Sequence, residues 1–121
     1  MKDLFDKVSL ECSKNVTNSY STSFSLATKM LSKNIRQDIY NIYGFVRLAD
    51  EIVDTFHDFD KKILLDRFIN ELDYSLENKI STNPILNSFQ FTVNKYKIDY
   101  ELIEPKKRKI VKKSYADNFL K

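Results

Sequence analysis

The chain of 121 residues is poor in the residues that make tight turns, with one glycine and two prolines. A sheet with many tight turns is therefore not expected. The glycine-rich loops that bind nucleotides in Rossmann and P-loop proteins are also excluded. If this chain binds phosphate, side chains and a metal ion must provide the contacts.

The sequence also has a single cysteine, Cys12, a single histidine, His57, and no tryptophan. Cys12 cannot form an internal disulfide, and a zinc site built from cysteine and histidine is excluded. No stretch approaches the roughly 20 apolar residues of a membrane span, and the N-terminus lacks the apolar stretch of a signal peptide. We therefore expect a cytoplasmic protein that contacts a membrane at most peripherally.

The composition is that of one globular domain, since 42% of the residues are apolar and 31% are charged, with nine Phe and seven Tyr. The net charge of +3 is unevenly placed. Six basic residues fall within eight positions: Lys106, Lys107, Arg108, Lys109, Lys112 and Lys113. Such a run is either a solvated tail or a segment that attaches to an anionic membrane surface or a partner. We expect no nucleic-acid partner.

The apolar periodicity predicts helices throughout, and no alternating strand pattern competes with it. Helices are expected over about 3–18 and 24–31 and from 34 to about 55 or 57, and we place a capping box at 34–37 with Asp38 in the first turn. Asp58 and Asp60 can cap a further helix whose apolar stripe is Leu65, Phe68, Ile69, Leu72 and Leu76. Asn83 followed by Pro84 begins another helix. The predicted fold class is all-α, a helical bundle.

The helix expected over 34–57 carries charged residues on one narrow stripe. At about 100° per residue, Tyr43, Arg47, Asp50 and Asp54 share a sector about 60° wide, while apolar residues occupy about half of the circumference. Gly44 also lies inside this helix and costs about 1 kcal/mol relative to alanine. It indicates either the close approach of a backbone or ligand, or a neutral change.

Two interpretations of the stripe compete. It can be an ion-pair ladder from Arg47 to Asp50 and Asp54, or a solvated seam. Alternatively, the two carboxylates bind magnesium, which takes one or two carboxylates together with water and substrate phosphates. Arg47 would then bind the phosphate with two hydrogen bonds.

Two segments together resemble a known family. The run Ser21-Thr-Ser-Phe-Ser-Leu-Ala27 and the run from Tyr43 to Asp54, Tyr-Gly-Phe-Val-Arg-Leu-Ala-Asp-Glu-Ile-Val-Asp, are similar to the N-terminal part of the squalene/phytoene synthase family, closest to its phytoene synthase branch. This resemblance implies an isoprenoid synthase-type helical bundle around an apolar cavity. It also implies a prenyltransferase that condenses two prenyl diphosphates, geranylgeranyl diphosphate in the phytoene synthase branch, head to head in carotenoid biosynthesis.

The resemblance also implies roles for individual residues. Asp50 and Asp54 match the aspartate-rich motif that binds Mg²⁺, and Arg47 matches the adjacent phosphate-binding residue. Ser21 and Ser23 match hydroxyl positions near the diphosphate, although either serine can simply cap a helix.

Two aromatic residues match cavity positions of the family. These residues are Phe24 and Tyr43, and core packing is the alternative role for both. Aromatic walls tolerate a carbocation, while the metal ion and the arginine neutralise the leaving diphosphate.

Members of this family are more than twice as long and carry a second aspartate-rich motif on a later helix. We therefore expect residues 1–105 to form the N-terminal part of such a domain, truncated to its first helices, and residues 106–121 to form a divergent basic tail. A separate chain carrying the missing motif would be a complementing partner. The alternative is a catalytically inactive helical fragment that uses the basic tail to bind a membrane surface or a partner.

Overall fold

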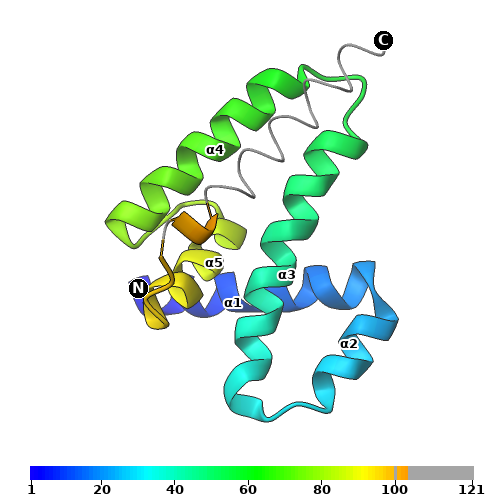
Figure 1. Cartoon of the computed structure of the whole chain (residues 1–121), viewed down its shortest axis with the longest axis vertical. Helices are drawn as coiled ribbons and strands as arrows, with labels where there is room; N and C mark the ends of the chain where they lie inside the picture. Colours follow the sequence, from blue (N-terminus) through cyan, green and yellow to red (C-terminus); the bar gives the residue numbers. More distant parts are fainter. Residues whose placement is uncertain (100, 104–121) are drawn as a thin grey trace.

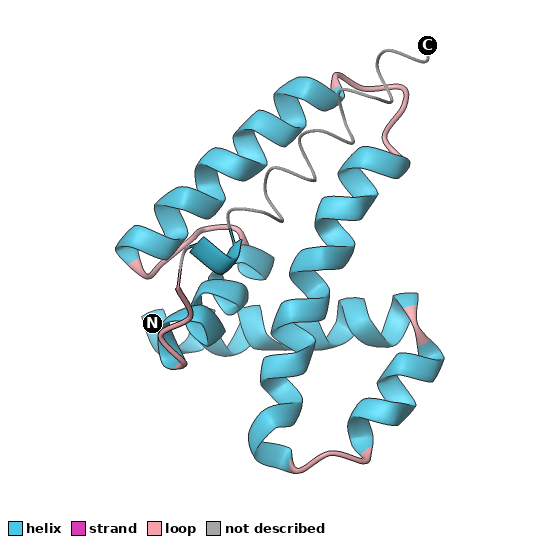
Figure 2. Cartoon of the chain, viewed as in Figure 1, coloured by secondary structure: helices cyan, strands magenta, loops and turns pink. Residues whose placement is uncertain are grey.

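The structure, a computed structural model, describes residues 1–99 and 101–103, and in this part helices are joined by loops with no strand (Figure 2). Five helices follow one another as α1 (Lys2–Tyr20), α2 (Thr22–Lys29), α3 (Lys33–Asp54), α4 (Lys61–Asn78) and α5 (Pro84–Lys95). A last helical turn covers 101–103. In Figure 1, α3 crosses α1, while α2 and α4 lie on opposite sides of α3. The predicted all-α class is confirmed.

Most helix starts follow from local sequence. The side chain of Asp60 accepts a hydrogen bond from the amide of Ile63 at the start of α4. The Asn83 side chain caps α5 in the same way, and Pro84 occupies the first turn, where its missing N–H costs nothing. Of the two aspartates predicted to cap α4, Asp60 is the N-cap, and the cap predicted at Asn83 is confirmed.

The capping box predicted at residues 34–37 is wrong. The helix α3 begins at Lys33 and its N-cap is Ser32, whose side chain makes no capping hydrogen bond. Gln37 instead donates to the carbonyl of Leu10 on α1. Asp38 is 5% exposed and accepts hydrogen bonds from residues of α5 and its C-cap. Gln37 and Asp38 are therefore held by partners on other helices rather than by a cap.

The apolar core lies between α3, α4 and α5. Phe45 of α3 stacks between Phe68 of α4, with ring centroids 5.8 Å apart, and Phe89 of α5, at 4.0 Å. The apolar stripe predicted for α4 belongs to this core. Ile103 joins the core from the last helical turn. This packing fixes the buried face of α3 and leaves its opposite face for the site.

A polar layer joins α1 to α3 and α5. The fully buried residues of α1 are Ser9, Ser13 and Thr17, at 0% exposure. The hydroxyls of Ser9 and Thr17 donate to carbonyls four residues earlier on α1 itself, while Ser13 pairs with Ser88 of α5. Small side chains with satisfied hydroxyls allow three helices to approach closely.

Of the helices in the described residues, none is long and apolar enough to cross a membrane. The basic run at 106–113 and the predicted boundary at residue 105 lie outside the described residues. The division of the chain into 1–105 and 106–121 stays a prediction.

Candidate functional site

The candidate site is built on the second half of α3, on the side away from the apolar core. Phe45, Ala49, Ile52 and Val53 bury the opposite side of the helix. Tyr43, Arg47 and Asp50 are half-buried and Asp54 is exposed. The carboxylates therefore lie at the border of the packed region rather than in the core.

An aromatic pair lies at one end of the stripe. Phe24 of α2 stacks on Tyr43 of α3, with ring centroids 4.7 Å apart and an angle of 23° between the planes. Phe24 is still 37% exposed. This contact joins two segments that the sequence separates, and it brings together two of the predicted binding residues.

Arg47 has its partners within one turn of α3 and at the end of α1. Its Nη2 donates to Oε2 of Glu51 at 3.1 Å, and its guanidinium carbon lies 5.1 Å from the ring centroid of Tyr20. The ion pair that the structure shows is therefore with Glu51, at i+4, rather than with Asp50, at i+3, as the ladder would require. Arg47 and Asp50 are neighbours on one face without forming that pair.

The carboxylate of Glu51 is stabilised in its ionised form. A hydrogen bond from the Thr55 side chain lowers the pKa of Glu51 most, and partial burial opposes the shift. The charge of Arg47 and hydrogen bonds from Tyr20 and Arg47 lower this pKa further. Glu51 is consequently a carboxylate at neutral pH.

Asp50 and Asp54 lie four residues apart on the same face of α3, so their side chains emerge one turn from each other. Among the described residues, there is no group of three or more His, Cys, Asp or Glu side chains that could hold a metal ion. Two carboxylates still fit magnesium, because this ion accepts one or two carboxylates and takes water and phosphate oxygens for the rest. The donor set therefore suits a metal ion that arrives with a phosphate ligand.

The two serines differ in their surroundings. Ser21 is the single residue between α1 and α2, and its hydroxyl accepts a hydrogen bond from the amide of Phe24 at 3.1 Å. Helix capping, the alternative role for Ser21, is therefore what the structure shows. Ser23 is exposed in the first turn of α2.

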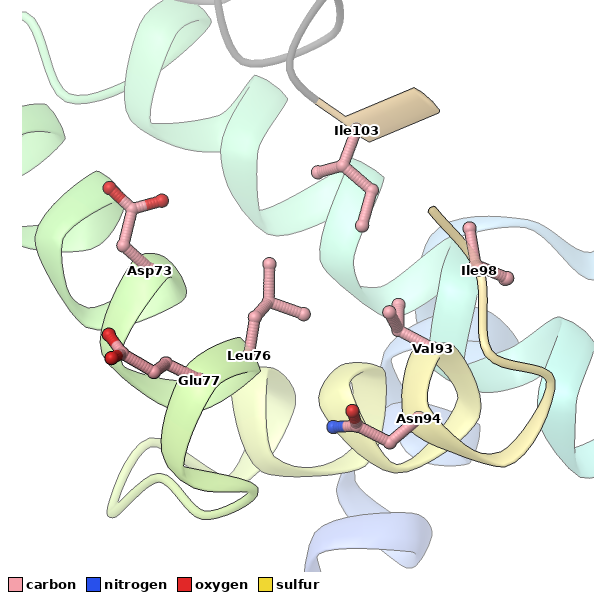
Figure 3. A pocket seen from close by; sticks show the side chains of 7 residues that line it. All are labelled: Asp73, Leu76, Glu77, Val93, Asn94, Ile98 and Ile103. Carbon is pink, nitrogen blue, oxygen red and sulfur yellow. The ribbon is translucent and has the colours of Figure 1, made fainter. Parts of the chain in front are cut away.

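A pocket of about 500 Å³ lies elsewhere, between α4 and α5. In Figure 3, Leu76 and Ile103 point toward its middle, with Asp73 and Glu77 on α4 at one side. None of the predicted site residues lines this pocket. Core residues Val93 and Ile103 form part of its wall, and the pocket is separate from the candidate site.

The prediction missed Tyr20 and Glu51. Glu51 could have been found, because it follows Arg47 by four residues, the spacing of a helical ion pair. Tyr20 lies 27 positions before Arg47 and meets it only because α1 crosses α3. The sequence carries no local signal for that contact.

The fold and the site together define an all-helical protein whose longest helix carries an arginine and two aspartates on one face. The family model for squalene/phytoene synthase matches residues 17–105 of the 121. The chain belongs to the squalene/phytoene synthase family, as the resemblance predicted, and this family is one of prenyltransferase-type enzymes of isoprenoid metabolism. Comparisons with curated proteins and with solved structures give no significant match.

Proposed function

We propose that this chain binds a prenyl diphosphate together with Mg²⁺ on the face of α3 that carries Tyr43, Arg47, Asp50 and Asp54. The observation that carries the proposal is the order of groups along this face. The aromatic pair of Phe24 and Tyr43 lies at one end of the face and the two carboxylates lie at the other. At the helical rise, Asp50 is about 10 Å and Asp54 about 16 Å along the axis from Tyr43. A ligand with an apolar tail and an anionic head would match this order, with its tail at the aromatic pair and its head at the carboxylates.

Asp50 and Asp54 are the residues that would hold the magnesium ion. When bound, the ion would supply positive charge that stabilises the diphosphate as a leaving group. Arg47 adds a second positive group one turn away, and its fork-shaped guanidinium suits phosphate oxygens. These three side chains account for the anionic end of the ligand.

The aromatic end would serve the reacting carbon chain. The faces of Phe24 and Tyr43 are electron-rich and stabilise a positive charge without acting as nucleophiles. The proposed reaction is therefore that of the phytoene synthase branch, in which two prenyl diphosphates, here geranylgeranyl diphosphate, condense head to head in carotenoid biosynthesis. The first aspartate motif and the aromatic pair are the supporting features.

A second set of carboxylates is part of this proposal. The described residues bring one aspartate pair to the site, and a diphosphate with several negative charges needs more than one cation. We propose that a partner chain that carries the second aspartate-rich motif provides the opposing carboxylates. A mixture with a chain that carries the second aspartate-rich motif should then be more active than either chain alone.

The direct test is a calorimetric titration with non-ionisable geranylgeranyl thiodiphosphate, with and without magnesium. The proposal expects binding that requires magnesium and is lost in Asp50→Asn/Asp54→Asn. The control Asp66→Asn/Glu77→Gln removes two negative charges from exposed positions of α4 and should bind as the wild type does. A helical wild-type chain that does not bind the analogue, or that binds it equally after the aspartate substitutions, would contradict the proposal.

A further inference from the structure

Glu51 is the central residue of a small cluster that holds Arg47. Its carboxylate receives the Arg47 guanidinium at 3.1 Å and also hydrogen bonds from the side chains of Tyr20 and Thr55. The two charged side chains are 16% and 27% exposed. The cluster therefore joins the end of α1 to two consecutive turns of α3.

The same cluster limits the freedom of the arginine. The Tyr20 ring lies against the guanidinium, 5.1 Å from centroid to carbon, while Glu51 binds Nη2. Within the described part of the chain, the buried Nε of Arg47 has no hydrogen-bond partner. Glu51 thus holds one edge of the guanidinium and the Tyr20 ring lies against one face. The remaining N–H groups can donate to a further acceptor.

We propose that Glu51 is a positioning residue, which holds the Arg47 guanidinium against Tyr20 so that it is already oriented for the diphosphate of the ligand. This inference rests on the proposed function, since it assumes that Arg47 binds that diphosphate. Glu51 acts through Arg47 and need not touch the ligand. Holding a flexible side chain in its bound conformation removes part of the entropy cost of binding.

The direction in which Glu51→Gln changes ligand affinity distinguishes a positioning role from simple charge repulsion. A carboxylate beside an anion site repels the ligand, so removing its charge should strengthen binding if charge alone mattered. If Glu51 positions Arg47, Glu51→Gln should instead weaken binding of the analogue, by about fivefold, the cost of ordering one long side chain. The two explanations thus predict opposite signs.

The test is a double-mutant cycle on binding of geranylgeranyl thiodiphosphate with magnesium, using wild type, Glu51→Gln, Arg47→Gln and the double variant. The positioning role expects the loss caused by Glu51→Gln to disappear in the Arg47→Gln background, because there is then no guanidinium to orient. Glu11→Gln removes the same charge from an exposed position of α1 and serves as the control. Far-ultraviolet circular dichroism checks that each variant is helical.

The possible outcomes are distinct. Equal or tighter binding by Glu51→Gln overturns the inference, and so does a loss that persists in the Arg47→Gln background, which would mean that Glu51 acts on the metal or the ligand directly. Dependence on Asp50 and Asp54 without any effect of Glu51 overturns the inference alone. Absence of wild-type binding overturns the proposed function and the inference with it.

A second variant keeps the test open if Glu51→Gln does not fold. Tyr20→Phe keeps the ring beside Arg47 but removes the hydroxyl that bonds Glu51. It should weaken binding of the analogue in the same direction and by less than fivefold. Unchanged or tighter binding by this variant would contradict the positioning role.

Discussion

Gly44 on α3 faces Ser13 on α1 so closely that a side chain at position 44 would make tight contacts. A Cβ atom at Gly44 would lie 3.1 Å from the Ser13 hydroxyl oxygen, 3.3 Å from its Cβ and 3.4 Å from its Cα. Of the two explanations for a glycine inside this helix, the close approach of a neighbouring backbone is therefore correct. The crossing of α1 and α3 depends on it, and this crossing also brings Tyr20 to Arg47.

We predict that Gly44→Ala lowers the free energy of unfolding by about 1 kcal/mol. Alanine gains about 1 kcal/mol of helix propensity, but overpacking against Ser13 costs about 2 kcal/mol, because the Ser13 Cβ, 3.3 Å away, cannot rotate away from the new methyl group. Urea denaturation followed by circular dichroism measures the change. Ser13→Ala in the Gly44→Ala background should recover part of the loss, and a more stable Gly44→Ala variant would show that α1 shifts easily.

The sequence pattern predicted α1 correctly but not its buried face. The apolar residues that indicate this helix include Leu4 and Val8, which are 54% and 42% exposed, whereas Ser9 and Ser13 are fully buried. Hydropathy could not show this, because close packing of α1 is decided by side-chain size and by hydroxyls that bond within the chain. On α3 the apolar face was predictable, since large residues fill the core there.

The candidate site shows the same limit. Local spacing placed Arg47, Asp50 and Asp54 on one face of α3, as the structure has them. Glu51 holds Arg47 from the same helix, but other partners come from distant segments, Tyr20 for the arginine and Lys95 for Asp38. Such contacts depend on the crossing angles of helices, which a single sequence does not encode locally.

Asp38 should make the stability of the fold depend on pH. Burial raises its pKa, but hydrogen bonds from Tyr96, Lys95 and Thr92 outweigh burial and hold the pKa below the ordinary value of 3.8. A lowered pKa in the folded state means that the stabilisation is complete above the unfolded pKa and is lost as the pH falls through the folded one.

We therefore expect Asp38→Asn to lower the free energy of unfolding at pH 7 by about 2 kcal/mol, the cost of losing hydrogen bonds to a charged acceptor. The difference from wild type should shrink below about pH 4. Urea denaturation at several pH values measures it, with Asp66→Asn as the exposed control. A difference that stays constant from pH 7 to about pH 3 would show that the Asp38 charge is not responsible.

Lys61 stabilises the end of the helix that carries Asp54. Its side chain is 5% exposed, and Nζ donates to the carbonyl of Val53 at 2.6 Å. Carbonyls in the last turn of a helix lack partners within it, and a positive charge there is favourable. Lys61→Met should therefore lower the free energy of unfolding by about 2 kcal/mol, while the exposed Lys62→Met should change it by less than about 0.5 kcal/mol. Equal effects in thermal unfolding would rule out the hydrogen bond as the cause.

The basic run at 106–113 provides a test of the alternative function. If it attaches the chain to membranes, co-sedimentation with vesicles containing anionic lipid should fall steeply as salt rises from about 0.05 to 0.5 M, because each basic residue near the surface contributes about 1 kcal/mol that salt screens. Neutral vesicles should not sediment the chain. Replacing the six basic residues with glutamine should abolish the association without changing helicity, and association that survives this replacement would exclude the run as the attachment site.

The stacking of Phe24 on Tyr43 allows a test of which end of the proposed ligand each part of the site binds. Phe24→Ala removes the exposed ring that covers Tyr43. It should weaken the binding of geranylgeranyl thiodiphosphate by about tenfold, because losing an aromatic contact with an apolar tail costs on the order of 1.5 kcal/mol. Binding of inorganic pyrophosphate with magnesium should change little, because the anionic end is recognised by Arg47, Asp50 and Asp54. Phe91→Ala on α5, at 47% exposure, is the matched control. An equal loss for both ligands would mean that Phe24 only supports the fold of α2 against α3, and the aromatic pair would then have no part in binding the prenyl chain.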